Sequence, residues 1–197
     1  MQQAILNKLR KNKFTLVLSI PKILKKIDRN NVRTNELINL DSLQYSVYGT
    51  AIPKVSIPAI PLNVMGQVYN VTSQVRPAYS PINVNFTIDN RLNNYWILWK
   101  WLSIINDPKN SGMNEEFAEY VKLSNGDLKM VNEFLDYQTI ITSYIEDEYN
   151  NKVAEVKYTN AFITDLGEIN YNYREPGELE SSFTFVFNQM DIKLLDI

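Results

Sequence analysis

Residues 50–66 read Thr-Ala-Ile-Pro-Lys-Val-Ser-Ile-Pro-Ala-Ile-Pro-Leu-Asn-Val-Met-Gly, and this stretch decides how the fold is interpreted. Its three prolines donate no backbone hydrogen bond, so they belong in extended loops and at sheet edges. An exposed apolar arm is an aggregation hazard unless something covers it. The stretch therefore predicts an extended arm that is either buried in a partner or folded back onto the chain's own core. Its strongly apolar residues are Val55, Ile57, Ile60, Leu62, Val64 and Met65.

On both sides of this arm, apolar and polar residues alternate with a period of two, which predicts half-buried strands. A short polar link at 149–152 suits a hairpin turn between two of these runs. The pattern predicts one domain over residues 1–197 with a mainly β fold: an antiparallel β-barrel or sandwich flanked by one principal α-helix. More polar stretches at 21–42 and 106–136 are interpreted as insertions with short helices. The alternating runs lie at 14–20, 43–48, 82–88, 137–145, 154–162 and 183–187, and a strand resumes at 67–75.

The principal helix is predicted over residues 91–105, with Asp89 or Asn90 as its N-cap and Pro108 beyond its end. Apolar residues fill most of its circumference, so the helix must be covered on two sides. Tryptophan is enriched at protein interfaces. The side chains of Trp96, Trp99 and Trp101 are therefore predicted to lie either in a subunit interface or in the chain's own core, with Trp99 on a stripe that would be buried.

Charge is distributed unevenly along the chain. Residues 1–35 carry nine Lys or Arg and one acidic residue, whereas residues 36–197 carry eleven basic and twenty-one acidic residues. The basic N-terminal arm, residues 1–12, is either a solvated segment or one that docks on an acidic surface of another copy or on nucleic acid. The basic residues at this end of the chain include Lys8, Arg10, Lys11 and Lys13.

The composition argues against catalysis. With neither histidine nor cysteine, the chain lacks imidazole bases, thiolate nucleophiles and the usual zinc ligands. No phosphate-cradling glycine loop is present, so we expect no enzymatic activity, no metal site and no cofactor. The N-terminus lacks a small-residue cleavage site and no run is long enough to span a bilayer, so we expect a soluble chain without an export signal or membrane anchor.

The acidic cluster around Glu146 and Glu148 has three interpretations. It could be a catalytic carboxylate pair, although adjacent strand residues point to opposite faces. It could be a solvated surface. It could also line a channel and repel DNA phosphates.

The order of these segments resembles a known family. The residues that carry the resemblance are the Ala51-Ile52-Pro53 turn before the arm, the passage from strand to helix at 82–101, and the stretch Asn-Ala-Phe-Ile-Thr-Asp-Leu-Gly at 160–167. Over residues 13–105 and 137–192, the chain resembles the tail tube proteins of contractile-tailed phages, which are similar in fold to the type VI secretion tube protein.

The resemblance implies a virion structural protein of the phage tail, assembled in the host cytoplasm. Its copies would form hexameric rings that stack around a channel for DNA delivery, with the 50–75 hairpin reaching the next ring. Implied partners are further copies of the chain and the tail sheath, tape-measure and baseplate proteins, and DNA would pass without specific binding.

The basic N-terminus and the insertions depart from the family pattern. They leave open whether the chain is the repeating tube subunit or a ring at a tube end, such as a tube-initiator or baseplate ring. A type VI secretion-like tube and a carbohydrate-binding β-sandwich are the remaining alternatives.

Overall fold

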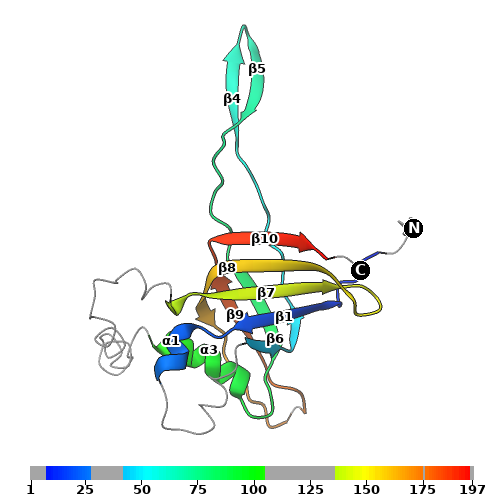
Figure 1. The fold of residues 1–197 in the computed structure, drawn as a ribbon, viewed down its shortest axis with the longest axis vertical. Helices are drawn as coiled ribbons and strands as arrows, with labels where there is room; N and C mark the ends of the chain where they lie inside the picture. Colours follow the sequence, from blue (N-terminus) through cyan, green and yellow to red (C-terminus); the bar gives the residue numbers. More distant parts are fainter. Residues whose placement is uncertain (1–7, 28–41, 105–135, 175, 196–197) are drawn as a thin grey trace.

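The computed structural model describes residues 8–27, 42–104, 136–174 and 176–195, which form a mainly β fold (Figure 1). The prediction of an antiparallel β fold with one principal helix is confirmed. In chain order the elements are β1 (Phe14–Ser19), α1 (Lys22–Ile27), β2 (Ser42–Tyr45), β3 (Val47–Gly49), β4 (Ala59–Val64), β5 (Gln67–Thr72), β6 (Ile82–Thr87), α3 (Asn93–Ser103), β7 (Thr139–Glu146), β8 (Lys152–Leu166), β9 (Glu180–Val186) and β10 (Gln189–Leu194).

The main sheet curls round until its two ends meet. Its strand order is β2-β1-β7-β8-β9-β6-β3, and β10 pairs with β8. Only Ser46 separates β2 from β3, and its carbonyl oxygen accepts a hydrogen bond from the backbone N–H of Thr87 at 2.9 Å. This one stretch pairs with β1 on one side and with β6 on the other, which closes the sheet into a barrel. The single strand predicted at 43–48 is therefore two short strands with a change of partner between them.

The long strand β8 connects the two halves of the barrel. Its first part pairs with β7 and β10, whereas Phe162 to Leu166 pair with β9. Asn160, where the partner changes, has a φ of 53°, in the left-handed region that asparagine tolerates better than most residues. Strand β10 was not predicted, although Met190, Ile192 and Leu194 alternate with polar residues.

Inward-facing side chains from the strands form one apolar core together with α1 and α3. Aromatic rings meet edge to face within it: Tyr158 lies 5.4 Å from Phe185, and Phe86 lies 5.7 Å from Phe183, between ring centroids. Such pairs stabilise a core beyond their buried area. Burial raises the pKa of Tyr158 to about 12. The alternation in the sequence thus produces a barrel that buries its own interior.

Helix α3 begins two residues later than predicted, at Asn93 rather than residue 91. Its N-cap position is held by Leu92, whose φ of 61° is left-handed, and not by Asp89 or Asn90. The Asp89 carboxylate nevertheless accepts hydrogen bonds from the backbone N–H groups of Arg91 and Asn93, at 3.0 and 2.7 Å. Asp89 therefore provides a hydrogen-bond acceptor for backbone N–H groups at the start of the helix, although it does not occupy the N-cap position.

The three tryptophans of α3 have different environments. Trp101 is fully buried, and its Nε1–H donates to the carbonyl oxygen of Tyr137 at 3.0 Å. Trp96 is partly buried against the core. Trp99 is 50% exposed, so its ring is not part of the chain's own core, and its place in a subunit interface stays a prediction. The helix repeat turns Trp99 away from the face that carries Ile97, Leu98 and Trp101.

Several predicted segments lie outside the described residues. These are residues 1–7 of the basic N-terminal arm, residues 28–41 of the 21–42 insertion, and the 106–136 insertion apart from Asp136. The described part of the first insertion contains α1, as the expected short helix.

We expect Trp101→Ala to lower the free energy of unfolding by about 3–5 kcal/mol, because it removes a fully buried ring and leaves a cavity. The matched variant Trp99→Ala should cost about 1 kcal/mol or less, since half of that ring already faces solvent. Urea unfolding followed by fluorescence measures both. Equal losses in the two variants would contradict this assignment of the helix faces.

Candidate functional site

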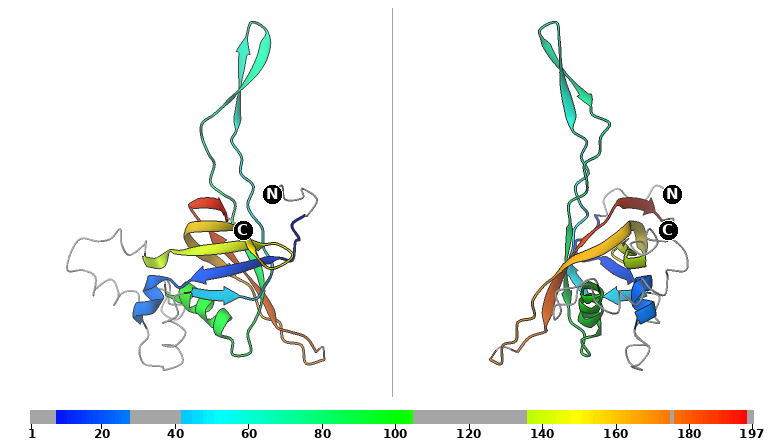
Figure 2. Two further views of the ribbon diagram at one scale, coloured as in Figure 1. Left: turned by 45° about the vertical axis from the view of Figure 1, so that its right-hand side comes forward. Right: turned by 90° about the vertical axis from the view of Figure 1, so that its left-hand side faces the viewer.

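The predicted arm is a β-hairpin that stands away from the barrel (Figures 1 and 2). Among the described strands, β4 and β5 pair only with each other, in register from Ala59 opposite Thr72 to Val64 opposite Gln67. The two residues at the tip, Met65 and Gly66, have φ values of 50° and 81°. Positive φ at both central residues defines a type I′ turn, whose twist matches a two-stranded ribbon.

One face of the arm is apolar. Residues directly opposite each other in a hairpin share a face. Ile60 pairs with Val71 and Leu62 pairs with Tyr69, and Val64 continues the same row. The other face carries polar side chains, among them Asn63, Asn70 and Thr72.

No part of the described barrel covers this apolar face. Every residue of β4 and β5 is exposed, and the tip residue Met65 is 100% exposed. Val55 and Ile57, nearer the barrel, are also exposed. The interpretation of the arm as a loop folded back on the chain's own core is therefore wrong. Sequence reasoning named only the β4 side of the arm. Tyr69 and Val71 of β5 complete the apolar face, and their alternation with polar residues was the signal, whereas the exposed Val68 lies on the other face, opposite Asn63.

The arm is joined to the barrel core at its base. The ring of Tyr79 stacks on Phe187 at 5.0 Å between centroids, and its hydroxyl accepts a hydrogen bond from the Arg76 guanidinium at 3.0 Å. Further out, the backbone N–H of Ser73 donates to the carbonyl oxygen of Pro58 at 3.0 Å, which brings the two sides of the arm together before β4 and β5 pair. The barrel therefore positions the start of the arm.

At the opposite end of the molecule from the arm, the loop between β8 and β9 projects from the barrel (Figure 2); the structure describes its residues 167–174 and 176–179, and we call it loop 167–179. Its first residue is held in place: the carbonyl oxygen of Gly167 accepts hydrogen bonds from Tyr95 Oη at 3.2 Å and from Ser181 Oγ at 3.0 Å. Further along the loop, the rings of Tyr171 and Tyr173 are exposed.

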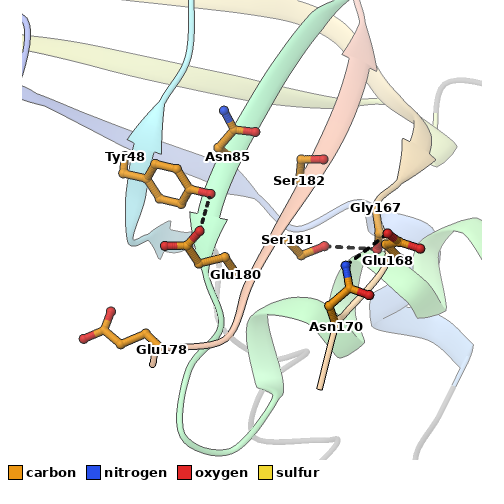
Figure 3. A pocket seen from close by; sticks show the side chains of 9 residues that line it. All are labelled: Tyr48, Asn85, Gly167, Glu168, Asn170, Glu178, Glu180, Ser181 and Ser182. Atoms are coloured by element: carbon orange, nitrogen blue, oxygen red, sulfur yellow. Dashed lines mark hydrogen bonds between the residues drawn. The ribbon is translucent and has the colours of Figure 1, made fainter. Parts of the chain in front are cut away.

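Beside this loop lies an open depression of about 450 Å³ with an acidic lining (Figure 3). Tyr48 Oη donates to a carboxylate oxygen of Glu180 at 3.0 Å, and Asn170 Nδ2 donates to Glu168 at 3.0 Å. The Glu178 carboxylate also lines it and points away from these contacts in the view. Among the described residues, no group of three or more acidic side chains is arranged to hold a metal ion.

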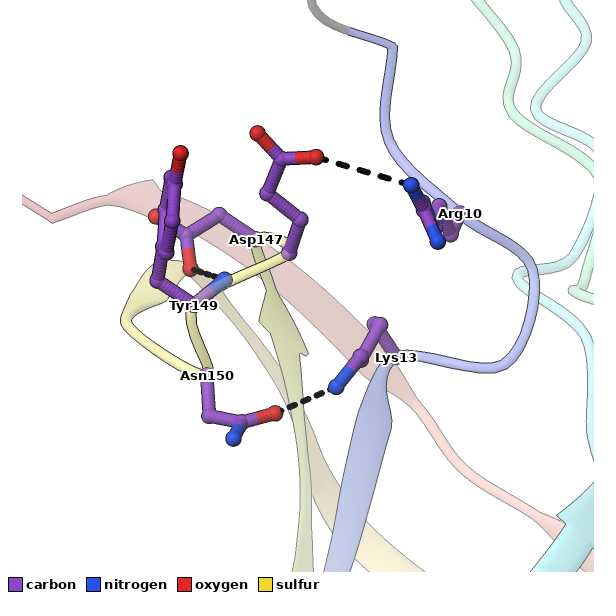
Figure 4. A network of polar contacts seen from close by, with 6 residues as sticks. Arg10, Lys13, Asp147, Tyr149 and Asn150 are labelled. Carbon is purple, nitrogen blue, oxygen red and sulfur yellow. Dashed lines mark hydrogen bonds and ion pairs between the residues drawn. The ribbon is translucent and has the colours of Figure 1, made fainter.

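The basic segment contacts the turn between β7 and β8 (Figure 4). The Arg10 guanidinium lies 3.6 Å from the Glu148 carboxylate, and Lys13 Nζ donates to Asn150 Oδ1 at 2.6 Å. Glu146 accepts a hydrogen bond from Thr15 Oγ1 at 2.8 Å. The structure thus brings both predicted acidic residues against the N-terminal segment of the same chain. The remaining basic residues singled out from the sequence, Lys8 and Lys11, are exposed.

Asp147 organises this turn through its own side chain. Its carboxylate accepts hydrogen bonds from the backbone N–H groups of Tyr149 and Asn151, each at 2.8 Å, and from Asn151 Nδ2 at 3.0 Å. These bonds, the one from the Asn151 side chain foremost, hold the pKa of Asp147 below its usual value. The predicted turn is therefore a hairpin turn that is held by hydrogen bonds from its own residues to the Asp147 side chain.

Known proteins that are similar to this chain have the same fold. The chain matches the family described as phage tail tube protein over residues 9–192. No curated protein matches the chain. None of the helices in the described ranges is long and apolar enough to cross a membrane.

Solved structures with the same fold come from contractile injection systems. A chain of the PVC sheath–tube complex in the extended state matches with a TM-score of 0.53 and 9% identity, covering 97% of this chain and 95% of that one. A chain of the anti-feeding prophage cap, described as a tube terminating cap, matches with a TM-score of 0.55 and 12% identity, covering 99% and 97%. A chain of the PVC sheath/tube terminator matches with a TM-score of 0.53 and 9% identity, covering 96% and 99%.

We expect Asn151→Ala to raise the pKa of Asp147 toward its usual value, because the foremost hydrogen bond to the carboxylate is lost. A folded-state pKa below the usual value means that this carboxylate stabilises the turn above the usual carboxyl pKa and loses that effect as pH falls through the folded-state pKa. NMR titration of the Asp147 carboxyl carbon measures the change.

The control for this titration is Asn150→Gly, which removes the contact with Lys13 but leaves every hydrogen bond to the Asp147 carboxylate and suits the positive φ of residue 150. An identical Asp147 titration curve in wild type and Asn151→Ala would contradict the proposed origin of the shift.

Proposed function

The chain belongs to the phage tail tube protein family, and we propose that it is a repeating structural subunit whose copies stack into a tube, with the arm of each copy buried against the next. The observation that carries this proposal is the apolar face of the arm. A lone two-stranded hairpin is marginally stable in water, and this one leaves Ile60, Leu62 and Val64 exposed in the single chain. Burial against a neighbouring copy removes that surface from water.

The reach of the arm supports contact between successive copies along one axis. An extended chain rises about 3.3 Å per residue, so residues 52–65 span up to about 45 Å. That length is well above the radius of gyration expected for a domain of this size, about 16 Å. A contact between the arm of one copy and the body of another, repeated with an axial rise, builds an open filament rather than a closed dimer.

In this proposal the copies form hexameric rings, and the stacked rings enclose a channel through which DNA is delivered from the virion tail, after assembly in the host cytoplasm. The tail sheath, tape-measure and baseplate proteins are the proposed partners. Acidic residues on a channel wall, with Glu146 and Glu148 as our candidates, would repel DNA phosphates and allow passage without specific binding. The function needs no catalytic group or cofactor.

A ring at the end of a tube is the second candidate. One observation supports it. A chain of a tube terminating cap and a chain of a sheath/tube terminator match this fold with TM-scores of 0.55 and 0.53, and a chain of a sheath–tube complex matches it with 0.53. A repeating subunit forms long tubes from the purified protein alone, whereas a terminal ring stops at one or two layers.

We expect the double variant Ile57→Asp with Ile60→Asp to fold normally but to form no tubes, because charges replace two apolar side chains of the arm that the barrel does not touch. Negative-stain electron microscopy of the purified protein detects the tubes, and circular dichroism checks the fold. The control is Tyr149→Asp, which places a charge at a more exposed position, in the β7–β8 turn.

Tubes of normal length in the double variant would count against the role of the arm. A wild-type protein that stays monomeric at high concentration would overturn the proposed function itself.

A further inference from the structure

The tube proposal does not say which surface of a neighbouring copy meets the base of the arm. The charges of the described residues point to one such surface. We propose that loop 167–179 of one copy docks on the base of the arm of the next copy, with Glu168 and Glu178 facing Lys54 and Arg76. This inference rests on the proposed function and adds the contact that sets the register between successive copies.

The two surfaces lie at opposite ends of the molecule (Figures 1 and 2). The arm leaves the barrel at one end, and the loop projects from the other. When copies are stacked along the direction of the arm, the loop of one copy approaches its neighbour where that neighbour's arm leaves the barrel. Arg76 is placed in this part of the arm by its contact with Tyr79, whose ring stacks on Phe187 of the barrel core. Lys54 lies on the other side of the arm, in the segment between β3 and β4.

The charges of the two surfaces are complementary. Residues 50–81 carry Lys54 and Arg76 and no acidic residue, for a net charge of +2. Residues 165–180 carry five acidic residues and one arginine, for a net charge of −4. Complementary charge fixes register and raises the rate of association more than it adds affinity.

These charges have no ion-pair partner within the described chain. Lys54, Arg76, Glu168 and Glu178 are all exposed, and no ion pair among the described residues involves any of them. Arg76 donates a hydrogen bond to the Tyr79 hydroxyl and lies over the Tyr79 ring, and no carboxylate of the described residues pairs with its charge. Each surface therefore presents charges that the other copy can pair.

Apolar groups flank the charges on both sides. Ile52, Val55 and Val75 are exposed beside the two cations of the arm base. Tyr171 and Tyr173 are exposed beside the acids of the loop. Tyrosine combines a large apolar ring with a hydroxyl group and is enriched at interfaces. A second copy of this chain thus matches the loop in charge and in apolar surface.

Cysteine cross-linking tests the contact directly, because the chain contains no natural cysteine. Two full-length proteins are prepared, one carrying Lys54→Cys and the other Glu178→Cys, then mixed, assembled and oxidised. We expect a covalent dimer from the mixture in much higher yield than from either protein alone. The control mixture pairs Lys54→Cys with Tyr149→Cys, an exposed position in a different loop, and should give only the background yield.

Charge exchange provides an independent measurement. Lys54→Glu with Arg76→Glu should raise the concentration for half-assembly about tenfold or more, because like charges then face each other across the contact. Glu168→Lys with Glu178→Lys should do the same. Combining all four substitutions in one chain should restore assembly toward the wild-type concentration, which a variant that merely misfolds would not do.

The outcomes separate this inference from the proposed function. Tubes that form without the specific cross-link, and whose assembly is insensitive to these charges, would overturn the inference and leave the tube proposal standing. A covalent product between Glu178→Cys and another tail protein, with no cross-link between copies of this chain, would assign the surface to that protein and overturn docking by a second copy. Failure of the wild-type protein to assemble would overturn both proposals.

Discussion

The apolar face of the arm can be buried only by something outside the barrel. Strands β4 and β5 pair with each other and with no other strand of the described chain, so no element of the main sheet lies over Ile60, Leu62 or Val64. A surface of this kind favours association because removing apolar area from water is worth roughly 25 cal/mol per Å². The proposed stacking gives this surface a partner, namely the next copy of the same chain.

The barrel makes such an arm possible because its own core is complete without it. The sheet closes through the shared stretch at Ser46, and the aromatic cluster around Phe86, Phe183 and Phe185 fills the interior. The arm joins this core only at its base, through the stacking of Tyr79 on Phe187. A stable body and an unburied arm are therefore separate parts of one chain, and changes to the arm's tip should alter assembly without unfolding the barrel.

The sequence predicted most of the fold because alternation with a period of two is a strong local signal. It located the arm and the strands of the barrel other than β10, and the three prolines of residues 50–66 indicated that the arm is extended. It did not predict which strand pairs with which, nor the change of partner at Ser46, since both depend on contacts between distant residues. The sequence also left open whether Trp99 lies in the core, because a helix that is apolar nearly all round does not reveal which face meets the sheet. The ion pair between Arg10 and Glu148 was not predicted either, because counting charges gives the net charge of a segment but not the residues that it contacts.

Hydrogen–deuterium exchange, compared between dispersed subunits and assembled protein, tests the central claim most directly. Amides of residues 59–72 that are open to solvent in the single chain should exchange rapidly in dispersed subunits and become strongly protected on assembly, while barrel amides in β6 and β9 stay protected in both states. Equal exchange of the arm amides in the two states would contradict the claim that the arm is buried against a neighbouring copy.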